Sequence, residues 1–402
     1  MRKKINFVLM GVGLGLGVTV AGLGGLSLHH KFNPQGLHEP SDTPGVKDAR
    51  AIAAIGRLGQ AHNYVVLADT NHENVSIRDF IFRPQMIRML AENGFKNITV
   101  EYSTSHQPLI DALTSGKISR DSFITTFQVI ANGYGMVESN MHLRDERDKL
   151  RVVENFADFI LEAKKHDIRI LAVNGMEGYS KDSKALLPQQ GARYLEFAKF
   201  IEASSAVHTL DAKTVIVDIY APLMDGVDKE TAKEALQKNP KTSAMTEGLE
   251  KLSRYDFAGA VYRIWAGLRH KENIIRENVL VAQVQKDERG FILSRLSQDD
   301  EVAARIRELS RGEKTLVIYG LAHSFHTMGN LPEKLDHAPT LMMIESPQEY
   351  SEVIRDCAAL ALLDNACEIG KGHYVFLYKE GYSFEAKPFG RKEAVQALTP
   401  SS

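Results

Sequence analysis

Residues 64–72 spell YVVLADTNH, an apolar and β-branched run that stops abruptly at Asp69 and is followed by His72. Such a run is typical of a buried parallel strand that delivers polar side chains to the rim of a sheet. In open α/β sheets, ligands bind outside the carboxyl ends of the strands. This stretch therefore predicts a parallel sheet with a functional edge, and it restricts the fold more than any other segment does.

Four later segments repeat the pattern of an apolar strand that ends in a polar residue or a glycine. They cover residues 97–101, 168–174, 315–320 and 340–345, and they end at Glu101, Asn174, Gly320 and Glu345. A last strand is predicted over residues 373–378. The spacing of apolar residues predicts helices over residues 47–59, 75–93, 106–131 (with a break near 115–116), 141–165, 191–206, 255–287 and 299–309. We therefore expect an α/β fold, with a mostly parallel sheet flanked by helices.

The composition is that of an ordinary globular protein of 402 residues, 44% of them hydrophobic and 25% charged. The 49 basic residues nearly balance the 51 acidic ones, so no overall basic field would recruit nucleic acid or an anionic membrane. The two cysteines, Cys357 and Cys367, exclude a disulfide scaffold and a cysteine-rich zinc site. Whether they form a pair or are two buried thiols stays open.

A basic tripeptide at residues 2–4 precedes an uncharged apolar segment over residues 5–28. This segment is long enough to cross about 30 Å of hydrocarbon. Two interpretations stay open: an uncleaved signal anchor with its N-terminus in the cytoplasm, or a signal peptide cleaved near the small residues at 18–22. Both predict an exported main domain, either anchored to the membrane or secreted or periplasmic.

The remaining domain organisation follows from proline, charge and apolar patterns. Residues 29–48 contain three prolines and several polar residues, as a linker does. A single α/β domain is expected over residues 49–390, with a helical insertion at about 225–285 and a tail at 391–402.

The strand ends supply the candidate functional residues. Asp69, His72, Glu101 and His323 form a set of nitrogen and oxygen donors that suits a divalent metal or a general acid–base cluster. Gly320, which precedes His323, would let the backbone approach a ligand. Arg276 would hold an anionic group, because the guanidinium binds carboxylates and oxyanions in a bidentate manner.

Other polar residues near the strand ends are weaker candidates for substrate or haem binding. They are Tyr102, His106, Asn174, Asn278 and Glu345. Ordinary roles as loop residues or strand caps compete with each of these assignments. The chain has no Gly-x-Ser-x-Gly elbow, no Walker loop and no Gly-x-Gly-x-x-Gly after a strand, so serine-triad and nucleotide-dependent enzymes are poorly supported.

The order of these motifs resembles a known superfamily. Residues 67–72 (LADTNH), then Glu101, then 276–278 (REN) and then 320–323 (GLAH) are similar to the landmarks of the haem-binding ChaN lipoproteins, the erythromycin esterases and, more distantly, the Tiki and TraB proteins. The resemblance covers roughly residues 64–345. Ala68-Asp69 stands where Gly-Glu is usual in the superfamily, and one extra residue separates the acid from His72.

The resemblance implies an α/β sheet with the cluster at its carboxyl edge. The esterase relatives activate water against an ester or lactone, the Tiki-type relatives bind a divalent metal and cleave peptides, and the ChaN-type relatives bind haem. We therefore expect a hydrolase acting on a small-molecule or peptide substrate, in which Asp69, His72, Glu101 and His323 activate water with or without a divalent metal. Arg276 would stabilise negative charge.

Two alternatives remain open. One is a non-catalytic haem- or iron-binding protein, with Tyr102, Tyr134 or a histidine as axial ligand. The other is a degenerate scaffold that serves protein contacts.

Overall fold

The computed structural model describes residues 44–69, 75–133, 146–175, 181–203, 229–238, 299–325 and 330–351, with shorter pieces at 240, 353–354, 369, 372–377 and 382–386. The expected membrane segment, His72, Tyr134, Arg276, Asn278, Cys357 and Cys367 lie outside these residues. Within them, no helix is both long and apolar enough to cross a membrane.

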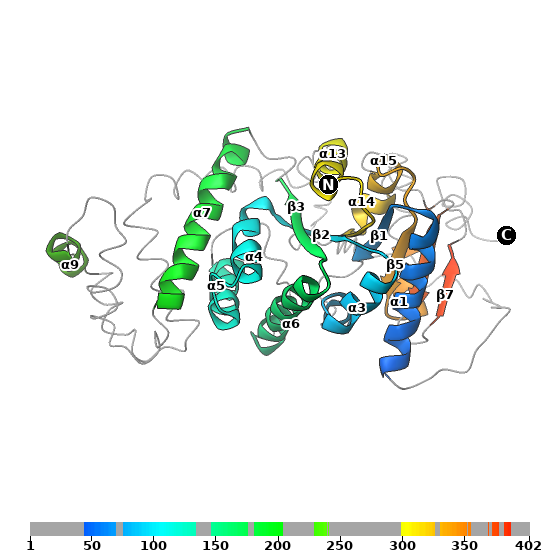
Figure 1. The fold of residues 1–402 in the computed structure, drawn as a ribbon, viewed down its shortest axis with the longest axis horizontal. Helices are drawn as coiled ribbons and strands as arrows, with labels where there is room; N and C mark the ends of the chain where they lie inside the picture. Colours follow the sequence, from blue (N-terminus) through cyan, green and yellow to red (C-terminus); the bar gives the residue numbers. More distant parts are fainter. Residues whose placement is uncertain are drawn as a thin grey trace, which may run out of the picture.

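The described residues contain one sheet of seven strands (Figure 1). The strands are β1 (Tyr64–Asp69), β2 (Asn97–Ser103), β3 (Arg169–Asn174), β4 (Thr315–Gly320), β5 (Thr340–Ile344), β6 (His373–Leu377) and β7 (Tyr382–Glu385). Their order is β3-β2-β4-β1-β5-β6-β7, and the first six in this order are parallel. The expected α/β fold with a mostly parallel sheet is therefore confirmed.

One strand was not expected from the sequence. The prediction that residues 373–378 form the last strand is wrong, because β7 follows and pairs with β6 in the antiparallel direction. With only four residues, β7 is too short for its alternation to stand out from a loop.

The helices divide between the two faces of the sheet. They are α1 (Pro44–Ala61), α2 (Val75–Ile81), α3 (Pro84–Glu92), the 3-10 turn η1 (Thr104–His106), α4 (Gln107–Thr114), α5 (Arg120–Gly133), α6 (Glu146–Lys165), α7 (Lys181–Ala203), α9 (Lys229–Lys238), α13 (Asp299–Ser310), α14 (Ala322–Phe325) and α15 (Leu331–Lys334). One core cluster joins apolar residues of α1 to α7 with one face, and a second joins α13 and α15 with the other. Figure 1 shows α3 and α6 on one side of the strands and α13, α14 and α15 on the other.

Two helices differ from the sequence-based expectation. The helix predicted over residues 75–93 is split into α2 and α3, because Pro84 keeps Arg83 extended at φ −75° and ψ 124°. The helix predicted over residues 191–206 begins ten residues earlier, at Lys181, and continues through Pro188. Gly191 lets this helix pass close to η1, since a Cβ there would lie 2.9 Å from the Ser105 carbonyl oxygen.

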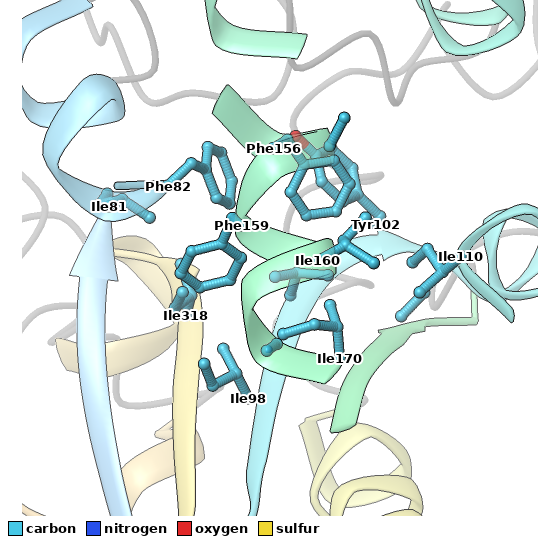
Figure 2. Packing of buried hydrophobic residues seen from close by; sticks show 14 of the residues in the cluster. Ile81, Phe82, Ile98, Tyr102, Ile110, Phe156, Phe159, Ile160, Ile170 and Ile318 are labelled. Carbon is cyan, nitrogen blue, oxygen red and sulfur yellow. The ribbon is translucent and has the colours of Figure 1, made fainter. Parts of the chain in front are cut away.

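Aromatic rings fill the space between α6 and the sheet. Figure 2 shows Phe156 and Phe159 of α6 beside Phe82 and Tyr102. The ring centroids of Phe82 and Phe156 lie 4.9 Å apart, and those of Tyr102 and Phe156 lie 5.0 Å apart, as in aromatic pairs that stabilise cores. This packing holds in place the second half of β2, where the strand ends in polar residues.

His106 lies at the side of this aromatic cluster. Its ring centroid is 5.3 Å from that of Phe127 and 5.6 Å from that of Tyr194, and its Nδ1 donates to the Ser103 carbonyl oxygen at 3.3 Å. Burial lowers the pKa of His106 to about 4, because the apolar surroundings disfavour the charged ring. The folded protein therefore holds His106 neutral.

This buried histidine predicts acid sensitivity of the fold. As the pH falls from 6.5 to 4, the unfolded chain takes up a proton at His106 that the folded protein does not, so stability falls by about 3 kcal/mol over this window. Urea unfolding followed by circular dichroism across this window should show the loss. In His106→Phe the unfolding free energy should fall by about 3 kcal/mol less over the same pH window.

His62→Gln, which changes an exposed histidine, is the matched control and should keep the slope of the unchanged protein. If His106→Phe and the unchanged protein lost stability in parallel as the pH falls, the role assigned to His106 would be wrong.

Candidate functional site

The carboxyl end of β4 is the centre of the candidate site. The backbone N–H of Gly320 donates to Oε2 of Glu101 at 2.6 Å, although the two residues lie 219 positions apart in the sequence. A Cβ at position 320 would lie 2.9 Å from that same oxygen. Only a glycine therefore fits here without moving the carboxylate.

Glu101 reaches this position where the register between β2 and β3 changes. Val100 pairs with Ala172 and Ser103 with Asn174, so β2 has one residue more than β3 over this stretch. Such irregularities redirect side chains and are common next to active sites. The Glu101 carboxylate is thus turned towards the end of the neighbouring strand β4.

His323 in the short helix α14 lies between two carboxylates. Its Nδ1 is 2.6 Å from Oδ1 of Asp299, the first residue of α13, and its Nε2 is 3.9 Å from Oε1 of Glu101. The side chains of His323, Asp299 and Glu101 are 7%, 0% and 12% exposed. The ring of Tyr319 packs edge-on against the imidazole, with centroids 4.8 Å apart.

The Asp299 contact determines which nitrogen carries the proton of a neutral imidazole. When Asp299 is ionised its carboxylate only accepts hydrogen bonds, so Nδ1 is the donor. The lone pair is then on Nε2, the nitrogen that faces Glu101. This is the arrangement that general-base histidines need.

Asp69 lies beside this group but contacts a different partner. Its Oδ2 is 3.1 Å from Nη2 of Arg78 in α2, with side chains 6% and 4% exposed. The backbone carbonyl of Asp69 accepts the N–H of Leu321 at 3.0 Å, which ties the end of β1 to the start of α14. Arg78 thus fixes Asp69 from one face of the sheet, while Asp299 fixes His323 from the other.

The structure brings together some of the residues predicted from the sequence and separates others. Glu101 and His323 face each other. Asp69 of β1 is the cross-strand neighbour of Gly320 in β4. Tyr102 and His106 are buried in the aromatic cluster rather than at a pocket mouth. Asn174 is buried at the end of β3, and Glu345 follows β5, where its N–H donates to a carboxylate oxygen of Glu349 at 2.5 Å.

Tyr102 contacts the Asp69–Arg78 ion pair from the side of the apolar core. Burial raises the pKa of Tyr102 to about 12, an effect partly opposed by the positive charge of Arg78. Burial thus disfavours the phenolate, which is the form in which a tyrosine ligates haem iron.

Three residues at this edge were missed by sequence reasoning: Arg78, Asp299 and Arg305, which donates to the Val173 carbonyl oxygen at 2.8 Å. Asp299 begins the acidic run 299–301, which is also what an ordinary first helical turn contains. Arg78 gave no clearer signal, because its burial within the short helix α2 becomes visible only in the fold.

The predicted metal site can be compared with the described donors. Among the described residues, no group of three or more histidine, cysteine, aspartate or glutamate side chains is arranged to hold a metal ion. Arg78 engages Asp69 and Asp299 engages Nδ1 of His323, so Oε1 of Glu101 and Nε2 of His323 are the donors that face each other. Catalytic zinc sites use three protein ligands. These two donors alone do not make such a site, and the fourth predicted ligand, His72, lies outside the described residues.

Comparisons with known proteins do not assign a family. No protein-family model matches the chain, and no curated protein matches it significantly. A protein from Bacillus cereus with a known crystal structure is 13% identical, with a TM-score of 0.32, and the alignment covers 77% of this chain and 74% of that chain. A similarity of this size supports no conclusion about function.

Proposed function

We propose that the chain is a hydrolase in which His323 acts as general base on a water molecule that attacks an ester or peptide-like carbonyl. The observation that carries the proposal is the position of the imidazole, with Nδ1 held by the buried Asp299 and Nε2 facing Glu101 at the carboxyl edge of a parallel sheet. This edge is where open α/β sheets bind their ligands.

The distance between Glu101 and His323 suits a shared water molecule. At 3.9 Å, Nε2 and Oε1 are too far apart for a direct hydrogen bond, and polar groups at this separation are commonly bridged by water. A bridging water would donate one proton to Nε2 and the other to the carboxylate. Its oxygen lone pair would then be directed away from both groups, towards a substrate.

The proposed reaction then proceeds in two steps. Nε2 removes a proton from the water as its oxygen bonds to the carbonyl carbon, and the carbonyl π electrons move onto the carbonyl oxygen. When the carbonyl re-forms, the bond to the leaving group breaks, and the imidazolium gives the proton that it took from the water to the leaving group. Asp299 stabilises the imidazolium between these steps, because it remains an ionised hydrogen-bond acceptor.

The other predicted catalytic residues have supporting parts in this proposal. Asp69 acts through its backbone, which holds the start of α14, while Arg78 balances the charge of its carboxylate. His72 and Arg276 remain predictions from the sequence as a further base or metal ligand and as the group that stabilises negative charge. Export of the domain likewise remains a prediction from residues 5–28.

Removal of the base tests the proposal directly. His323→Gln and Glu101→Gln should each lower kcat/KM by at least about a hundredfold, the usual contribution of a positioned general base. Hydrolysis of a panel of chromogenic esters, lactones and peptides measures the loss. His62→Gln changes an exposed histidine just before β1, at the opposite edge of the sheet, and should hydrolyse the panel at the unchanged rate.

Two results would contradict this function. One is full hydrolysis by a folded His323→Gln variant. The other is a Soret absorption band in the purified protein without hydrolysis of any substrate in the panel, which would favour the haem-binding alternative.

Gly320→Ala provides a second test, because it removes none of the proposed catalytic side chains. The added Cβ would lie 2.9 Å from Oε2 of Glu101 and should displace this carboxylate. We expect a loss of turnover on the order of tenfold or more, as for other small misplacements of catalytic groups.

Gly312→Ala is the matched control, just before the other end of β4. Its φ of +72° makes alanine unfavourable by about 1 kcal/mol, but an added Cβ would meet no atom within 4 Å. This control should lower the melting temperature without lowering turnover. Equal turnover in Gly320→Ala and the unchanged protein would mean that Glu101 needs no fixed position.

A further inference from the structure

The helix that carries His323 is too short to be stable by itself. α14 has four residues, a single turn, and isolated turns of this length do not persist in water. A turn of this length closes few hydrogen bonds of its own. Contacts with the rest of the fold must hold the turn, and with it the direction of the imidazole.

One of these contacts comes from a distant strand. Nε2 of His373, the first residue of β6, lies 2.8 Å from the carbonyl oxygen of Ser324, the residue directly after His323. A carbonyl only accepts, so His373 donates. In the sheet, β1 and β5 lie between β4 and β6. The bond therefore joins α14, which follows β4, to a strand that is not next to β4.

The surroundings of this bond are buried and apolar. His373 and Ser324 are both buried, and Leu321, just before α14, belongs to the same apolar cluster as Met342 of β5 and Val375 of β6. Leu321 thus presses the start of the turn onto the sheet, while His373 holds its later part. Loss of this hydrogen bond would leave the buried Ser324 carbonyl without that donor, which is costly in apolar surroundings.

We propose that His373 is a positioning residue for His323, acting through the Ser324 carbonyl to fix the turn that aims Nε2 at Glu101. This inference rests on the proposed function of His323. His373 itself does not touch the substrate.

The test compares three variants of the full chain. His373→Leu removes the donor, whereas His373→Gln keeps an N–H donor on a side chain of similar reach. Thr340→Val is the matched control. Thr340 of β5 is the cross-strand partner of His373 in β6, is also buried, and its hydroxyl has no hydrogen-bond partner in the described structure. The control thus changes the same packed region without touching the bond to Ser324.

The first measurement needs no substrate. The proton on Nδ1 of His323, bonded to Asp299, should give a downfield resonance in the NMR spectrum of protein labelled with ¹⁵N-histidine, assigned by its absence in His323→Gln. We expect this resonance to broaden or shift in His373→Leu and to be retained in His373→Gln and Thr340→Val. In His373→Leu, kcat should fall about ten- to a hundredfold while KM changes little, since a misdirected base affects the chemical step.

The outcomes separate the two proposals. An unchanged resonance and unchanged kcat in His373→Leu would overturn the positioning role, and equal losses in His373→Leu and Thr340→Val would assign His373 to packing alone. If a folded His323→Gln variant kept full hydrolysis, the proposed function would fail, while the effect of His373 on the His323 resonance would still be decided by NMR.

Discussion

β1 holds the architecture together because it is buried from end to end and is paired on both sides. Its register with β4 places Asp69 beside Gly320, and its register with β5 places the same residue beside Met343. Because all three strands run in the same direction, their polar ends meet at one edge. A slip of one residue in either pairing would move Asp69 away from its neighbours Gly320 and Met343 and turn the apolar side chains to the wrong face.

Charged groups are buried at this edge at a cost to stability. The Asp69–Arg78 ion pair and the Asp299 carboxylate beside His323 are almost fully removed from water, and buried charges seldom stabilise a fold as much as apolar packing would. Apolar rings of Tyr102 and Tyr319 lie against the two pairs. Low exposure strengthens the electrostatic interactions within the site, which is useful to a catalytic base and unnecessary for a structural one.

The sequence predicted those features that are encoded locally. The strands that end at Asp69, Glu101 and Gly320 could be found because an apolar run that stops at a polar residue is a signal within a few positions. Asp299 could not be found in this way. It meets His323 only because α13 packs against the sheet, and no spacing in the sequence indicates this contact. Arg78 is a similar case, because its burial depends on the fold around α2. Pro84 should have predicted the break between α2 and α3, and β7 was too short to detect.

The position of β4 between β2 and β1 has a consequence for folding during synthesis on the ribosome. The first two strands of the described sheet, β1 and β2, do not pair with each other, and the strand that joins them is synthesised more than two hundred residues later. Until β4 has emerged, both strands keep an open edge, as slowly folding sheets with distant pairings do. A nascent chain therefore has neither a finished sheet nor an assembled site until β4 and the strands after it have been made.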